Sequence, residues 1–172
     1  MYLEVGAHRT FAAAIDWAGW CRSGRDEDSA LQALVDYAPR YARVLKATQL
    51  SFSIPSDVSE FVVVERLTGN MTTDFGAPNL ALSNDTQPID STELERFEII
   101  LKACWRTFDK SVIAATGHSL RKGPRGGGRD AAKIVEHVRD VDAAYLSSLG
   151  GKWKPSVEAK PSEALVGLYP KL

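Results

Sequence analysis

The sequence has few cysteines, no long apolar run and no excess of charge of one sign, and each shortage excludes a class of protein. Two cysteines among 172 residues cannot form the framework of a disulfide-rich domain. No stretch approaches the roughly 20 apolar residues that a membrane-spanning helix needs. Lys plus Arg number 21 and Asp plus Glu number 22, so the net charge of −1 argues against a wholly basic nucleic-acid binder. The first ten residues lack the basic and apolar regions of a secretory signal, and we expect a cytoplasmic protein without a membrane partner.

What the sequence does contain is an average globular composition, with 44% apolar and 25% charged residues. We expect the α+β class and four consecutive regions. Residues 1–68 mix strand and helix patterns, and residues 69–89 form a long polar connection rich in Asn, Thr, Asp, Gly and Pro. Residues 90–151 are helical, and residues 152–172 form a tail that contains three prolines.

In the first region the order of elements is predicted to be β-β-α-β. Residues 2–5 and 10–15 form the first strand pair, and residues 17–24 read as a loop. A helix begins near Asp26 and is expected to kink, or to give way to a new helix, at Pro39. The β-branched and aromatic run at residues 61–64 is the strongest strand pattern.

The helical region contains two long amphipathic helices. The first begins at the capping box of residues 90–93, and its apolar positions recur at steps of three and four until Gly117. The second begins at Asp130 and ends at residues 150–151. Two such helices joined by a loop should form an antiparallel hairpin with a half-covered apolar face. We expect that face to be covered by the sheet, by the tail, or by a homodimeric or other protein partner.

His137 is the most informative single residue for chemistry. It lies in the middle of the second long helix, beside the apolar positions Ile134 and Val141. Such a histidine is a metal ligand, a base, or a structural side chain bonded to a neighbour. A metal site needs three or more ligands, and His8 and His118 do not share its helix.

The loop between the two helices is basic and rich in glycine. It carries Arg121, Lys122, Arg125 and Arg129 and leads into a helix N-terminus at Asp130. Guanidinium groups and free amide groups at such a position suit an anion. The alternative is a solvated hairpin loop without a ligand. The sequence gives little support for a nucleic-acid partner, because Trp153 is the only aromatic side chain near the loop in sequence.

The two cysteines have different settings in the sequence. Cys104 falls on the apolar stripe of the first long helix and reads as inert core. Cys21 falls in the predicted loop next to Arg22, whose positive charge would lower the pKa of the thiol.

The first region resembles the HicB-like antitoxin fold. Members carry two glycines separated by four residues, followed by an acidic segment that leads into an Ala-Leu pair at a helix start. Here these are Gly19, Gly24, the acidic residues 26–28 and the pair 30–31. The resemblance implies a small αβ module used for protein contacts, without a catalytic site.

The helical region resembles the first two helices of the four-helix DinB/YfiT-like bundle. The segment Lys133–Val138 matches the family's pattern near the start of its second helix, followed by residues 145–146. In that family the matching histidine is one of three metal ligands, so the role would fall on His137. The other two ligands usually lie on a later helix, and this sequence has no histidine after His137.

Together these observations predict a bacterial cytosolic protein of binding or interaction type with an incomplete DinB-type metal site. No cofactor is expected, although Zn or Ni would bind if further ligands were supplied. Two alternatives remain open: a DinB/YfiT-like metal-dependent transferase or hydrolase that uses His137, and a protein that contacts anions or nucleic acid through residues 121–129. The sequence does not decide whether the protein is an enzyme.

Overall fold

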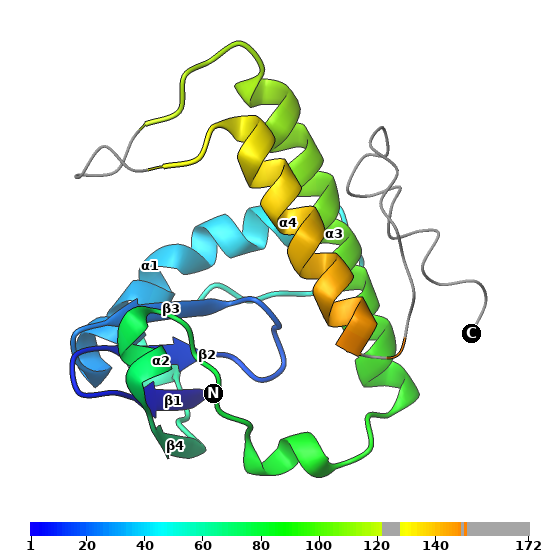
Figure 1. Ribbon diagram of the computed structural model, residues 1–172. Coiled ribbons are helices and arrows are strands. Elements are labelled where there is room, and N and C mark those ends of the chain that lie inside the picture. The colour runs from blue at the N-terminus through cyan, green and yellow to red at the C-terminus, as the bar shows by residue number, and fades with distance from the viewer. Residues whose placement is uncertain (122–127, 149, 151–172) are drawn as a thin grey trace. The chain divides into compact units, whose positions relative to one another are not determined.

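The computed structural model of the protein describes residues 1–121, 128–148 and 150 (Figure 1). It confirms the α+β class, with a four-stranded mixed sheet and four α-helices in these residues. The chain divides into two compact units, Met1–Ala103 and Cys104–Leu172. Within the described ranges, no helix combines the length and the apolar character needed to span a membrane.

The sheet belongs to the first unit and has the strand order β3-β2-β1-β4. β1 (Tyr2–Val5) pairs antiparallel with β2 (Thr10–Ala13), and β2 pairs antiparallel with β3 (Cys21–Gly24). α1 (Glu27–Leu45) then leads across the sheet to β4 (Glu65–Thr68), which pairs parallel with β1. This is the predicted β-β-α-β order with one additional strand, β3.

Two strand assignments from the sequence were wrong. Residues 17–24 were expected to be a loop, yet Cys21–Gly24 is an edge strand; its sequence, Cys-Arg-Ser-Gly, lacks the β-branched alternation that marks a strand. The fourth strand is Glu65–Thr68 and not residues 61–64. The register places Tyr2, the first residue of β1, opposite Glu65, so residues 61–64 precede the paired part of the ladder.

The predicted helix near Asp26 is confirmed. Asp26 is the N-cap of α1 and accepts a hydrogen bond from the Ser29 amide at 2.8 Å, as in a capping box. The expectation of a new helix at Pro39 was wrong, because α1 continues through that residue to Leu45. Pro39 is exposed, so its ring meets solvent and not the core. The buried side of the helix recurs every three or four residues: Ala30, Leu34, Ala38, Tyr41 and Leu45.

An aromatic cluster closes one end of α1. Tyr41, on the buried side of the helix, stacks on Trp20 with ring centroids 6.0 Å apart. Phe52 meets both rings edge to face at 5.0 and 4.8 Å, and Phe61 meets Trp20 at 5.8 Å. The Trp20 indole N–H donates to the Leu34 carbonyl at 3.1 Å, and this bond ties the loop before β3 to α1.

The connection at residues 69–89 contains two short helices, α2 (Met71–Phe75) and the 3₁₀ turn η2 (Ser83–Thr86). Asp90 caps α3 (Ser91–Ala115), as the capping box predicts, and the border between the two units lies within this helix. α4 (Ala131–Ser148) belongs to the second unit. The predicted antiparallel packing of α3 against α4 stays a prediction.

Candidate functional site: a cavity on one face of the sheet

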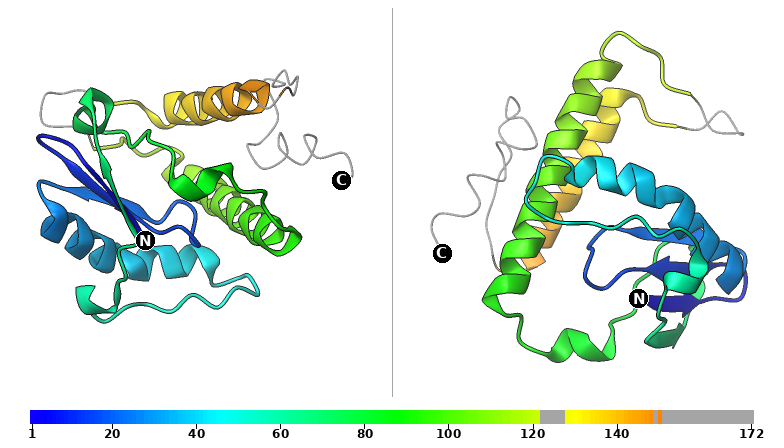
Figure 2. Two further views of the ribbon diagram at one scale, coloured as in Figure 1. Left: turned by 90° about the horizontal axis from the view of Figure 1, so that it is seen from below. Right: turned by 180° about the vertical axis from the view of Figure 1, so that it is seen from behind.

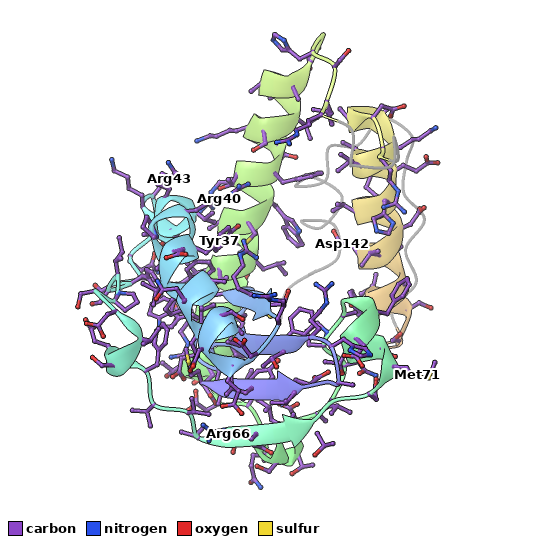
Figure 3. All side chains as sticks on the ribbon, turned by 90° about the vertical axis from the view of Figure 1, so that its left-hand side faces the viewer. Tyr37, Arg40, Arg43, Arg66, Met71 and Asp142 are labelled. Atoms are coloured by element: carbon purple, nitrogen blue, oxygen red, sulfur yellow. The ribbon has the colours of Figure 1, made fainter. Side chains whose placement is uncertain are left out.

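The register of the strands assigns side chains to two faces of the sheet. Leu3 lies opposite Ala12, which lies opposite Arg22, so these three side chains share one face. The Arg22 guanidinium lies 3.1 Å from the centre of the Tyr37 ring. Tyr37 belongs to α1 (Figure 3), so this is the face that α1 covers. Arg66 of β4 lies on the same face and bonds Glu27 of α1 at 3.1 Å.

The neighbouring residues therefore point to the opposite face of the sheet. That face carries Tyr2, Glu4, Ala13, Cys21 and Glu65. The segment that contains α2 lies on this side, whereas α1 lies on the other (Figure 2). The first unit thus has a regular helix over one face and an irregular connection over the other.

Glu4 holds this connection to the sheet. Its side chain is fully buried, and Oε1 accepts a hydrogen bond from the Thr73 hydroxyl at 2.6 Å. Oε2 accepts from the backbone amides of Asn79 and Leu80, each at 3.1 Å. A buried carboxylate is costly without partners, and these three donors satisfy it.

Glu65 and Asp74 provide two further attachments. Glu65 on β4 accepts hydrogen bonds from the backbone amide and the hydroxyl of Ser83, at 3.1 and 3.0 Å. Asp74 on α2 accepts from the amides of Ala7, His8 and Arg9 in the turn between β1 and β2, with the shortest bond, to His8, at 2.7 Å. The amide of His8 is the main cause, with the other two amides, of a lowered pKa at Asp74. A Cβ at Gly6 would collide with the Asp74 carboxylate, so this turn requires a glycine there.

Between the attached connection and the sheet lies a cavity of about 640 Å³, which is the candidate site. Tyr2, Ala13 and Cys21 of the sheet form its floor, and all three belong to the face opposite α1. The remaining walls come from residues 14–15 and 18–20, from the connection and from the start of α3. The lining from the connection and α3 is Pro78, Leu80, Leu82, Asn84, Asp85, Gln87, Pro88, Ile89, Glu93 and Phe97.

Burial changes the acidity of the two polar groups on the floor. It raises the pKa of Tyr2, and the neighbouring acidic groups Cys21, Glu4 and Asp85 raise it further. Burial also raises the pKa of Cys21 to about 11, and this effect outweighs the opposing charge of Arg22. The sequence-based expectation for Cys21 was therefore wrong, because a strand at the cavity floor desolvates the thiol more than Arg22 stabilises the thiolate. The protonated thiol is a poor nucleophile. What the cavity offers a ligand is its shape, its apolar surface and its hydrogen-bonding groups.

The predicted metal ligand has a different setting. His137 lies on α4 and is exposed, as are Glu136 and Asp140 next to it in sequence. In the described parts of the chain, no group of three or more His, Cys, Asp or Glu side chains is arranged to hold a metal ion. The role of His137 as a ligand stays a prediction.

Two of the four predicted anion-binding residues come together in the second unit. Arg121 and Arg129 line a cavity of about 260 Å³ with His118 and the start of α4. The Asp130 carboxylate accepts from the Lys133 amide at 2.8 Å and so occupies one of the free amides at this helix end. Lys122 and Arg125 lie outside the described residues.

The cavity on the sheet was not predicted from the sequence. Its floor depends on β3, which the sequence does not mark as a strand. The sequence offered two weak signals. Glu4 lies between the apolar residues Leu3 and Val5 of a predicted strand, and the polar connection is long enough to cover one face of a sheet.

Comparison of the chain with family models, with curated proteins and with solved structures gives no match. The resemblances to HicB-like and DinB/YfiT-like proteins therefore stay predictions.

Proposed function

We propose that the protein is a binding protein whose first unit holds a small molecule in the cavity between the sheet and residues 78–97. The observation that carries the proposal is the construction of this cavity. Its volume of about 640 Å³ falls within the range of roughly 300–1,000 Å³ that small-molecule sites occupy. Its lining combines apolar side chains with nearly as much polar surface, and the polar groups of Asn84, Asp85 and Gln87 would orient a ligand.

The anchoring of the connection supports the same proposal. Glu4, Glu65 and Asp74 fix residues 73–83 at three separate places. A wall held in this way keeps its shape before a ligand arrives, and a preformed site loses less conformational entropy on binding.

A neutral amphipathic probe, 4-phenylbutan-1-ol, tests this function. Titration of the ¹⁵N-labelled chain should shift the amide signals of Tyr2, Ala13 and Cys21, with a dissociation constant in the millimolar range or tighter. The variant Ala14→Phe places a ring at the cavity wall and should abolish these shifts. The control Ala33→Phe adds the same ring on α1 and should leave them intact. Equal binding by both variants would contradict the proposal.

A second candidate function is anion contact by the second unit, favoured by the placement of Arg121 and Arg129 around one small cavity. Two guanidinium groups at such a place suit a phosphate-bearing ligand. Inorganic pyrophosphate is the probe. Arg121→Gln and Arg129→Gln should each weaken its binding several-fold, whereas Arg43→Gln on the exposed side of α1 should not. Unchanged affinity in the first two variants would remove this candidate.

A further inference from the structure

The charged side chains that line the cavity on the sheet are both acidic. They are Asp85 in η2 and Glu93 in the first turn of α3. Leu80 and Ile89 of the same connection supply apolar surface beside them. The lining therefore combines negative charge with apolar walls.

The two carboxylates differ in the hydrogen bonds and ion pairs that they already form within the protein. Glu93 accepts a hydrogen bond from the Asp90 amide at 3.3 Å and lies 3.9 Å from the Arg96 guanidinium, which offsets part of its charge. Asp85 uses Oδ2 to accept from the Leu82 amide at 2.8 Å. Its second oxygen takes part in no hydrogen bond or ion pair with the described residues. Asp85 is thus the acid best placed to accept from a ligand.

Asp85 is an exposed residue that lines the same cavity as Tyr2. After burial, the negative charges that raise the pKa of Tyr2 include that of Asp85.

We infer that the ligand of this cavity is a small amphipathic cation, with an ammonium group at Asp85 and an apolar body against Leu80, Ile89 and Phe97. The inference rests on the proposed binding function and assigns the chemical class of its ligand. An ammonium group has three N–H donors. One of them would donate a charge-assisted hydrogen bond to the free carboxylate oxygen of Asp85. An anion of the same shape would meet two carboxylates and be repelled.

Three probes of nearly equal shape separate charge from fit: 4-phenylbutylamine, 4-phenylbutan-1-ol and 4-phenylbutanoate. At pH 7 and low ionic strength, the amine should bind the full chain at least about fivefold more tightly than the alcohol, and the carboxylate should bind most weakly. The readout is the titration of the Tyr2, Ala13 and Cys21 amide signals.

The variant Asp85→Asn keeps an acceptor for the Leu82 amide and removes the charge. It should bring the amine to within about twofold of the alcohol. Asp90→Asn is the matched control, because Asp90 also caps a helix in this region but does not line the cavity. It should keep the preference for the amine.

The outcomes distinguish the preference for a cation from the existence of the binding site. Equal binding of all three probes, or an equal loss of preference in both variants, would overturn the inference about charge and leave the binding site in place. Failure of every probe to bind would overturn the proposed function itself.

Discussion

The two faces of the sheet are covered in opposite ways. One face meets α1, whose buried residues recur every three or four positions and are apolar. The other face meets an irregular connection that is held by carboxylates at Glu4, Glu65 and Asp74. Leu3 and Glu4 are adjacent in the chain and both fully buried, yet they serve these two different kinds of contact.

This difference between the two coverings indicates where a cavity forms in a small domain. A regular helix presents a continuous apolar stripe that fills the space above a sheet, so the α1 face is close-packed. An irregular segment fixed by separate hydrogen bonds touches the sheet at those points and leaves space between them. The cavity lies on the face that the connection covers.

The largest expected effect concerns the packed face. Leu34→Ala removes a fully buried side chain of α1 and should lower the free energy of unfolding by about 3 kcal/mol, because a cavity remains. Urea denaturation followed by circular dichroism measures it. The control Leu94→Ala removes a leucine that is 45% exposed and should change stability far less. Similar losses in the two variants would show that the α1 face is not the packed one.

The next effect concerns the anchor on the opposite face. Glu4→Gln replaces one accepting oxygen with an amide that donates, so a buried donor loses its partner and stability should fall by about 2 kcal/mol. The variant should also weaken binding of 4-phenylbutan-1-ol, since the cavity wall is no longer fixed. Glu98→Gln, at an exposed position on α3, is the control. If Glu4→Gln left both stability and binding unchanged, Glu4 would not be the anchor.

A smaller effect comes from acid. The pKa of Asp74 is lowered in the folded state, so its hydrogen bonds to the β1–β2 turn stabilise the protein above the ordinary Asp pKa of about 4. That contribution is lost as the pH falls through the lowered folded-state pKa. Unfolding measured between about pH 5 and pH 2 should therefore depend less on pH in Asp74→Asn than in the unaltered chain. The same dependence in both proteins would contradict the role given to Asp74.

The smallest effect is the slow reactivity of the thiol on the cavity floor. With a pKa of about 11, Cys21 should be alkylated by iodoacetamide at a rate that still rises roughly tenfold per unit between pH 8 and pH 10. Mass spectrometry of a Cys104→Ser variant isolates the reaction at Cys21. A rate that levels off below pH 9 would mean that the thiol is not desolvated at this floor.

The packed face could be predicted from the sequence, and the opposite face could not. The acidic residues after Asp26 and the apolar spacing that follows marked α1, and the capping box at residues 90–93 marked α3. These patterns are local, so they predict a helix independently of contacts with distant residues. The partners of Glu4 lie 69 to 76 residues away along the chain, and no local pattern predicts such contacts.

The same reasoning explains the errors in the strands. The run at residues 61–64 has the side chains of a strand, but the register with β1 pairs the next four residues. Cys21–Gly24 has none of those side chains and pairs because β2 lies beside it. Tertiary pairing overrides strand propensity in both cases. His137 is exposed on α4, and its role as a metal ligand stays a prediction.

The most direct test of the central claim is a map of ligand-induced shifts over the two faces of the sheet. Titration of the ¹⁵N-labelled chain with 4-phenylbutylamine should move the amide signals of Tyr2, Ala13, Cys21 and Asp85. Those of Ala30, Leu34 and Ala38 on the packed face should stay in place. Shifts centred on α1, or none on the cavity floor at millimolar probe, would contradict the account.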